Sequence, residues 1–521
     1  MSGQHGALRG FSNVPHGGDG LARFGRMFPG LSAATWGPTF EASRAVLISL
    51  AETMLQEQEK PGTPIGEKEF EDENDDIPAG YTYLGQFIDH DITFDPASHL
   101  DRLNDPDALE DFRTPRLDLD SLYGRGPADQ PYLFSSQSKY TRFLLGKPKA
   151  PRSLRGKRRP DLPRNSDNPA RALIGDKRND ENKVVSQLHT LFLMFHNQVI
   201  RKLEVDFAEA QRLVRWHYQW IVLNDFLKRI VGPTTWAKVL TPAGPVLSYY
   251  LLDQHRYPYM PVEFAGAAYR FGHSMVRPAY SLNPTIIGPQ NKKFARVPFF
   301  TDDSKPASRN NLNGFGPIPN DWGIDWGFFF GVVPARANQG LVIPQPSYRI
   351  DTMLVDPLAH LPEFAGATNP WERSLAARNL VRGLALRLPS GQAVAHRIKV
   401  AALTDGELWD NEGNLGDQAQ ARRQFFANHR AVLERNAPLW YYVLREAEIT
   451  TRRPKKGEPL LGGHHLGPVG GRIVAETLVG LAVHDGQSYL TQAPGWEPDP
   501  RIAGNEPKSF DMQKLIEFVD A

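Results

Sequence analysis

Apolar residues recur every three or four positions in several stretches of the chain, which predicts amphipathic helices. The strongest patterns cover residues 183–204 (KVVSQLHTLFLMFHNQVIRKLE) and 207–230. We expect both to be long, largely buried helices. Weaker helical patterns occupy residues 41–58, 371–386, 416–435 and 469–483.

Between these helices, the chain is rich in residues that end regular structure. Pro, Gly, Asp and Arg dominate residues 95–183, and residues 280–350 combine many Pro, Gly and Asn with the aromatic cluster WGIDWGFFFG. We expect long loops and short helices there, with the aromatic cluster plugging the core. The sequence contains no repeat and no alternation of strands and helices. The predicted fold class is mainly α, a single large helical domain with long irregular loops and little β.

The domain boundaries follow from changes in composition along the chain. We predict an irregular N-terminal arm over residues 1–25, a main helical domain over 26–490 and a C-terminal extension over 491–521. Length alone would favour two to four domains, because 521 residues exceed the usual size of one core. A helical protein built around a buried cofactor accommodates a larger single domain.

Charge gives little indication of a macromolecular partner. The formal net charge is +1, so no overall attraction to nucleic acid or an anionic membrane is expected. Residues 146–159 (GKPKAPRSLRGKRR) are a local exception with seven Lys or Arg and no acid. Their prolines and glycines favour a solvated loop over a polyanion site.

The chain contains no cysteine, which excludes disulfides and thiolate metal sites. Any metal must be held by His, carboxylate, carbonyl or a prosthetic group. No apolar run approaches the roughly 20 residues needed to span a bilayer. The N-terminus lacks the charged start and apolar core of a secretory signal. These features predict a protein that is cytoplasmic or secreted by a leaderless route.

The segment GQFIDHD, residues 85–91, is the first candidate for chemistry. Gln86, Asp89, His90 and Asp91 lie within one and a half turns if the segment is helical. Burying a histidine between two acids is costly without polar partners. On its own, the segment fits a capped, partly exposed histidine as well as it fits a reactive site.

Three later segments carry polar residues at close spacing. These are Arg178 with Glu181 in RALIGDKRNDEN, His273 after Gly272 in AYRFGHSMVRP, and Asn379 with Arg382 in RNLVRGLALRLPSG. A glycine beside a histidine permits the close approach of a flat ligand. Taken singly, each segment is a weak signal, because a lone histidine is more often a packed core residue and an Arg–Glu pair is more often a salt bridge.

In this order, the motifs G-Q-x-x-D-H-D, R-N-D-E, R-x-G-H and G-P-V-G-G-R-I-V resemble the animal-type haem peroxidase superfamily. That superfamily includes myeloperoxidase-like, peroxidasin-like and cyclooxygenase-like enzymes. The resemblance runs from about Arg23 to about Val483. It implies that residues 26–490 form a haem peroxidase catalytic domain holding haem b. Without cysteines or a signal peptide, the chain looks like a bacterial member.

The resemblance implies a catalytic trio on the distal side of the haem. His90 would take a proton from bound peroxide and return it to the leaving oxygen, with a pKa near working pH if unperturbed. Arg178 would stabilise the charge that develops on the separating oxygens. Gln86 would bond to water or an anion above the iron.

On the other side, the resemblance implies that His273 binds the iron, with Asn379 bonded to its second ring nitrogen. Arg382 would face a haem propionate. Asp89 and Glu181 match acids that form ester bonds to haem, so both ester-linked and non-covalent haem are left open. Asn182 stands where myeloperoxidase has a methionine that forms a third link, which excludes that link here.

The resemblance also implies a Ca²⁺ site. Its ligands would be Asp91, Thr114, Asp118, Asp120 and the backbone carbonyl of Arg116, a set of hard oxygen donors of the kind calcium takes. The alternative is an Asp-rich helix cap.

The implied enzyme uses hydrogen peroxide to oxidise a small reducing substrate, namely a phenol, an amine or a halide. The first alternative is a haem-dependent fatty-acid dioxygenase, but Arg270 occupies the position where the superfamily's dioxygenases carry a radical-forming tyrosine, three residues before the proximal histidine. Tyr269 would point elsewhere, about 100° away on a helix. The second is a haem- and calcium-binding interaction protein with little turnover. We interpret His189 and His196, seven residues apart, as packing residues rather than a metal pair.

Overall fold

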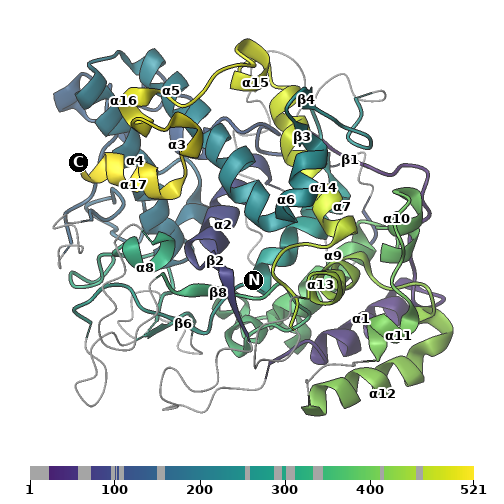
Figure 1. Cartoon of the computed structure of the whole chain (residues 1–521). Helices are drawn as coiled ribbons and strands as arrows, with labels where there is room; N and C mark the ends of the chain where they lie inside the picture. Colours follow the sequence, from purple (N-terminus) through teal and green to yellow (C-terminus); the bar gives the residue numbers. More distant parts are fainter. Residues whose placement is uncertain are drawn as a thin grey trace.

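The structure is a computed structural model of the chain (Figure 1). It describes residues 23–56, 72–94, 100, 102–104, 109, 111–149, 159–252, 258–286, 296–300, 311–331, 344–410, 416–452 and 461–521. Most of the predicted N-terminal arm and of the basic loop at 146–159 lies outside the described residues.

The 21-residue helix α4 (Lys183–Leu203) is almost fully buried along its first two thirds. It begins where the side chain of Asn182 accepts hydrogen bonds from two backbone amides of the first turn. Its neighbours are α2 (Gly80–Ile92), α5 (Phe207–Trp220) and α17 (Met512–Asp520). The predicted buried helix over 183–204 is therefore confirmed.

The helix predicted over 207–230 is confirmed, although it contains a π-helical segment and continues beyond residue 230. After α5, a π-helical segment (Ile221–Phe226) leads into α6 (Leu227–Val239). Inside α6, Gly232 adopts a φ of 74° directly before Pro233. Proline lacks the amide hydrogen that a continuous helix needs, so the chain kinks there.

Helix α6 packs against α14 (Pro468–Val483), which confirms the predicted helix over 469–483. Helix α13 (Leu439–Thr450) lies beside α14. The carboxylate of Glu446, in α13, accepts hydrogen bonds from the amides of Val469 and Gly470. This contact satisfies amides at the start of α14 that have no partner within the helix.

A further group of helices occupies the right-hand side of Figure 1, from mid-height to the bottom. It contains α1 (Phe40–Glu52), α9 (Leu375–Ala385), α10 (Gly391–Arg397), α11 (Asp405–Trp409) and α12 (Gly416–Leu433). Helix α1 packs on α9 and on α12. The helices predicted over 41–58, 371–386 and 416–435 are present, with shorter ends than the apolar pattern suggested.

Strands are few and short among the described residues. Four two-stranded sheets pair β1 (Phe24–Gly25) with β5 (Met260–Pro261), β2 (Glu73–Pro78) with β8 (Pro346–Tyr348), β3 (Leu240–Thr241) with β4 (Gly244–Pro245), and β6 (Ala279–Tyr280) with β7 (Val297–Pro298). The first pair is parallel and the others are antiparallel. The fold is mainly α with little β, as predicted.

Short helices fill the connections. They include α3 (Asp120–Tyr123), α7 (Val262–Gly266), α8 (Gly327–Phe330), α15 (Tyr489–Gln492), α16 (Pro500–Ala503) and the 3₁₀ turns η5 (Lys177–Asp180) and η7 (Ala268–His273). Helix α8 belongs to the aromatic cluster and is buried. A Cβ at Gly80 would lie 2.5 Å from the ring of Phe330. The absence of a side chain at Gly80 therefore lets α2 pack closely against α8.

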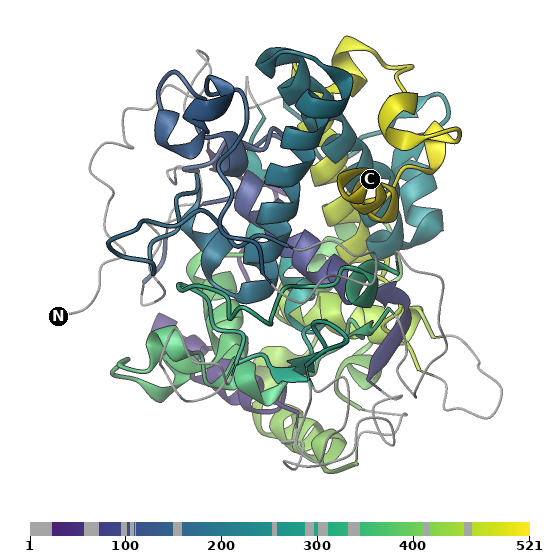
Figure 2. The ribbon, with the colours of Figure 1, turned by 90° about the vertical axis from the view of Figure 1, so that its left-hand side faces the viewer.

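The last residues pack on the body of the molecule. Apolar side chains of α17 belong to the same buried cluster as those of α2 and α4, and Figure 2 shows the C-terminal helices opposite the loops of residues 111–149. Arg159 binds the carboxylate of Asp520 through a buried ion pair. Among the described residues, no helix combines the length and the apolar character needed to cross a membrane.

Candidate functional site

One cavity of about 540 Å³ brings together the residues that the sequence predicts for catalysis and cofactor binding. Its lining includes Gln86, Asp89, His90, Arg178, Glu181, His273, Asn379 and Arg382. These side chains come from α2, from η5 and the residue after it, from η7 and from α9. Residues as far apart in sequence as Gln86 and Arg382 therefore meet in a space within the usual size range of cofactor sites, about 300–1,000 Å³.

His90 lies near the C-terminal end of α2 and is buried. Its Nδ1 lies 2.8 Å from Oδ1 of Asn179, and its Nε2 lies 3.6 Å from Oε1 of Glu181. Burial, assisted by the Arg178 guanidinium, lowers the pKa of His90 to about 4. The expectation of a pKa near working pH is therefore corrected, because desolvation disfavours the charged ring. The neutral ring is the form that can accept a proton.

Arg178 lies on η5, a turn capped by the side chain of Asp176. Its Nη2 lies 2.7 Å from Oδ2 of Asp176 and donates at 3.0 Å to the backbone carbonyl of His90. Its guanidinium also sits 4.6 Å from the centre of the Phe94 ring. These contacts fix a positive charge beside His90.

Glu181 is one of the acidic residues that line the cavity. It accepts a hydrogen bond from Nε2 of Gln86, whose own Oε1 accepts one from Nδ2 of Asn182 at 3.0 Å. Burial raises the pKa of Glu181 to about 8, and the carboxylate of Glu363 acts in the same direction. At neutral pH, Glu181 is therefore mainly protonated.

His273 ends η7, and its ring is held by α9. Nδ1 of His273 lies 2.7 Å from Nδ2 of Asn379. Burial lowers the pKa of His273 to about 3, and the cations Arg270 and Arg382 add to this effect. A Cβ added at Gly272 would meet no atom within 4 Å. The structure therefore has open space beside a neutral histidine.

Tyr269 also lines the cavity, contrary to the expectation that it points elsewhere. Its buried hydroxyl donates to the carbonyl of Gly85 at 3.2 Å. Residues 268–273 form a 3₁₀ turn, which rotates side chains by about 120° per residue rather than the 100° assumed from an α-helix. Arg270 lines the same cavity.

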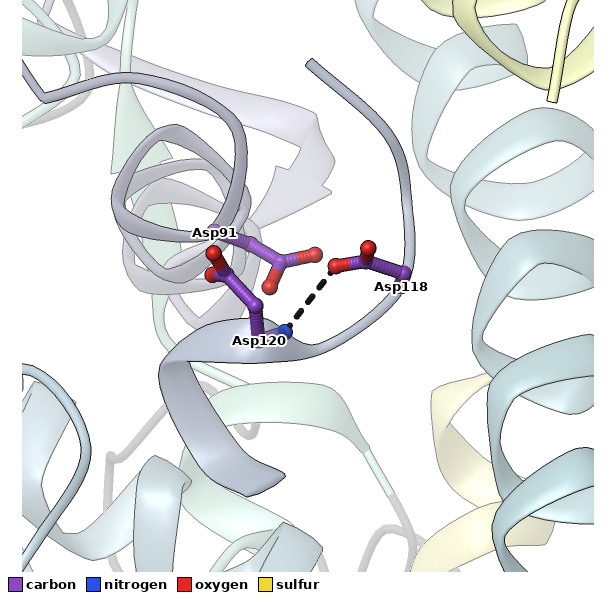
Figure 3. A group of neighbouring side chains, drawn as sticks. All are labelled: Asp91, Asp118 and Asp120. Atoms are coloured by element: carbon purple, nitrogen blue, oxygen red, sulfur yellow. Dashed lines mark hydrogen bonds between the residues drawn. The ribbon is translucent and has the colours of Figure 1, made fainter. Parts of the chain in front are cut away.

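A second site lies at the end of α2, where Asp91, Asp118 and Asp120 converge (Figure 3). Each offers a carboxylate oxygen, and these oxygens lie within 4.8 Å of one another. Thr114 donates from Oγ1 to Asp118 at 2.9 Å, and the amide of Asp120 donates to Asp118 at 3.1 Å. Burial and the charge of Asp120 raise the pKa of Asp118 to about 7.

Arg116 lies in the same loop as these acids. Its Nε is 4.0 Å from Oδ1 of Asp485, and its amide donates to the carbonyl of Thr114 at 2.7 Å. Thus Thr114 joins the carboxylates through its side chain, while the guanidinium of Arg116 faces Asp485. The backbone carbonyl of Arg116 stays a predicted ligand.

The sequence interpretation missed several residues around His90. Asn179 bonds to its ring and His189 bonds to Asn179. Asp176 accepts hydrogen bonds from Arg178 and also from Arg113. Asp176 has a sequence signal, because an aspartate two residues before a turn's basic residue is a typical cap. Asn179 has no such signal in the sequence. One of its partners, His90, is distant along the chain, and the other, His189, lies within the apolar pattern of a helix. His196, by contrast, bonds to Tyr123 and to the carbonyl of Thr141, as a packed histidine would.

Comparison with known proteins finds a similarity to haem peroxidases over part of the chain. The family model described as animal haem peroxidase matches residues 104–313. A peroxidase-like protein of Margaritifera margaritifera is 36% identical over 115 residues, and thyroid peroxidase of Homo sapiens is 32% identical over 115 residues. Each match covers 20% of this chain but only 14% and 12% of the respective relative.

Two solved structures resemble the fold over nearly the whole chain. Peroxidase A from Dictyostelium discoideum has a TM-score of 0.58 at 17% identity, covering 96% of this chain and 93% of its own. A fatty acid alpha-dioxygenase from Oryza sativa has a TM-score of 0.57 at 14% identity, covering 97% and 80%. At these identities, the likeness establishes the fold.

Proposed function

We propose that this chain, a member of the animal haem peroxidase family, uses hydrogen peroxide to oxidise a small reducing substrate such as a phenol, an amine or a halide. The observation that carries the proposal is the meeting of His90, Arg178, Gln86 and His273 on one cavity. A protein that merely bound haem would not need the first three residues together.

The residues present fit a haem. A neutral His273 can donate a ring nitrogen to iron, and the open space beside Gly272 suits a flat macrocycle. Iron binding through Nε2 requires a proton on Nδ1, and the Asn379 amide meets this requirement when turned by 180° to present its oxygen. Arg382 lines the same cavity and suits a haem propionate. When bound, haem supplies the iron that binds peroxide and stores its oxidising equivalents.

The chain's own residues then handle the proton and the charge. The neutral His90 ring accepts the proton of peroxide at Nε2 and returns it to the oxygen that leaves. Arg178, fixed by Asp176 and by the carbonyl of His90, stabilises negative charge on that oxygen. Gln86 orients a water molecule or an anion beside His90.

We further propose that Asp89 and Glu181 tether the haem through ester bonds. Both carboxyls line the cavity, and the protonated state of Glu181 lowers the cost of burying it. Mass analysis of denatured protein tests this directly. Haem that stays with the chain after denaturation supports the tether, and complete release of haem contradicts it.

The cluster of Asp91, Asp118 and Asp120 is proposed to bind Ca²⁺, together with Thr114 and the carbonyl of Arg116. Three carboxylates held this close repel one another, and a divalent cation relieves that repulsion. Because Asp91 follows His90 directly, the cation would hold the end of α2 and with it the ring of His90.

Fatty-acid dioxygenation is the second candidate. The observation in its favour is that Tyr269 borders the cavity, where an oxidised tyrosine could reach a substrate. Arg270 argues against it, because it lies three residues before His273, where the superfamily's dioxygenases carry their radical-forming tyrosine.

The test uses protein purified with haem. A Soret band that is lost in His273→Ala, together with peroxide-dependent oxidation of a phenolic dye, supports the proposed peroxidase. Absence of a Soret band after haem is supplied contradicts the whole proposal. Oxygen uptake with linoleate that exceeds dye oxidation and disappears in Tyr269→Phe supports the dioxygenase instead.

A further inference from the structure

Three buried side chains form a continuous hydrogen-bonded series that leads away from the cavity. Nδ1 of His90 lies 2.8 Å from Oδ1 of Asn179, and Nδ2 of Asn179 lies 3.0 Å from Nδ1 of His189. The residues come from α2, η5 and α4, and none is more than 4% exposed. Such a series requires each donor to face an acceptor.

The amide of Asn179 can order this series in two ways. With its oxygen toward His90, it accepts the Nδ1 proton of His90 and donates from Nδ2 to the bare Nδ1 of His189. The Nε2 of His90 then carries a lone pair beside the cavity. With the amide reversed, the proton of His90 moves to Nε2, and that atom can no longer accept one.

We propose that Asn179 is the positioning residue that fixes the proton of His90 on Nδ1, with His189 holding the amide in the required orientation. This inference rests on the proposed role of His90 as the base that accepts a proton from peroxide. It gives a function to His189, whose Nε2 is buried and has no hydrogen-bond partner among the described residues.

The turn that carries Asn179 holds His90 at a second point. Arg178, the preceding residue, donates to the backbone carbonyl of His90 at 3.0 Å. The amide of Phe315 donates to the carbonyl of Asp180 at 2.7 Å, and Arg164 binds the Asp180 side chain. The turn is therefore anchored on both sides, so that Asn179 presents its amide to His90 from a fixed backbone.

The test compares Asn179→Leu with Asn179→Asp, two substitutions of nearly the same shape. Leucine removes the acceptor, whereas aspartate keeps an oxygen that accepts the Nδ1 proton. We expect Asn179→Leu to keep its Soret band while the rate constant for reaction with peroxide falls roughly 10²- to 10⁴-fold. Asn179→Asp should recover the rate to within about tenfold of the parent, and the KM for the reducing substrate should stay within about twofold in both.

Cyanide binding gives a readout without turnover. Hydrogen cyanide must release its proton to a base as it binds iron, so its association rate constant, followed by the Soret shift, should fall in Asn179→Leu and recover in Asn179→Asp. If Asn179 merely fills space, leucine will keep both rate constants and aspartate will offer no advantage. That result overturns the inference, whereas failure of the parent protein to bind haem or react with peroxide overturns the proposed function instead.

His189→Phe keeps the inference testable if a change at Asn179 prevents folding. Without the acceptor on His189 the amide is free to reverse, so the peroxide rate constant should fall. In the double variant Asn179→Leu/His189→Phe, the second change should add little, because both act through one hydrogen-bonded series.

Nitrogen NMR of the full chain carrying labelled histidine and zinc protoporphyrin, assigned with His90→Gln, should show the His90 proton on Nδ1. A proton on Nε2 in the parent contradicts the inference.

Discussion

Arg113 lies against Asp176, with its Nε and Nη2 3.0 and 2.6 Å from one carboxylate oxygen. Nη1 of the same guanidinium lies 3.4 Å from Oδ1 of Asp120, and Asp176 in turn holds Arg178. Burial alone would raise the pKa of Asp176, but the guanidinium groups of Arg178 and Arg113 lower it overall. A series of paired charges thus joins the candidate cation cluster to the cavity.

Arg113→Leu should destabilise the fold by about 3–5 kcal/mol, because it leaves buried carboxylates without their main counter-charge. Urea unfolding measures this change in the free energy of unfolding. Arg125→Leu is the matched control, since Arg125 pairs with Asp129 in an exposed ion pair and should cost less than about 1 kcal/mol. Equal losses for the two variants would contradict a structural role for the Arg113–Asp176 pair.

Asp118→Asn should have opposite effects with and without calcium. Without calcium, the variant should be more stable than the parent, because it removes one of three mutually repelling carboxylates. With calcium, the parent should gain melting temperature while the variant gains little. Thermal melts in EGTA and in excess Ca²⁺ measure both effects, with Asp129→Asn as the control. A calcium-dependent shift that survives in Asp118→Asn would argue against the cation site.

Asn379→Leu should weaken haem binding roughly 10- to 100-fold, because Asn379 orients the ring of His273 through its Nδ1. Titration of the full chain with haem, followed by the Soret band, measures the affinity. Asn369→Leu serves as the control, since Asn369 is exposed and bonds to Glu372. Unchanged haem affinity in Asn379→Leu would contradict the proposal that Asn379 orients His273 for haem binding.

The burial of His217, which does not line the cavity, predicts that the stability of the fold depends on pH. Its Nδ1 donates to the carbonyl of Leu213 and its Nε2 accepts from the amide of Asp499, at 2.7 and 3.0 Å. Burial lowers the pKa of His217 from 6.5 to about 4. Between these values the unfolded chain binds a proton that the folded chain does not, so stability contributed by His217 is present above pH 6.5 and is lost as pH falls toward 4.

The slope should reach about 1.2 kcal/mol per pH unit for this residue at its steepest. Other groups titrate in the same range, so the measurement is the difference between the parent and His217→Phe in urea unfolding from pH 7.5 to 4.5. The variant should be less stable at pH 7.5 but lose less stability on acidification. Parallel pH curves for the two proteins would refute the shifted pKa.

The helical framework could be predicted because it depends on local periodicity. The apolar spacing of residues 183–204 predicts α4 almost to the residue, and the resemblance predicts which side chains share the cavity. The predicted helix ends at residue 230, just before Gly232 and Pro233, so the continuation of α6 beyond this kink to Val239 was missed. The helix at Met512–Asp520 was also missed, although its apolar residues have helical spacing, because its nine residues are fewer than the window of about 11–18 in which such spacing is read.

The residues that orient His90 could not be predicted for a different reason. Asn179 lies 89 positions after His90, and His189 occupies a position in α4 that an apolar residue could fill equally well. Their roles exist only once α2, η5 and α4 pack together. Hydrogen-bond partners across such distances are set by the tertiary structure and leave no spacing in the sequence.

The packing of α17 against α4 also sets the order of events during synthesis. The residues that line the cavity run from Phe24 to Leu386, whereas α4, which follows η5 along the chain, receives one of its supports from residues 512–520. A ribosome adds residues one at a time, so this support cannot form until residues 512–520 have been made. Helix α4 therefore gains this support only after every residue that lines the cavity has been synthesised.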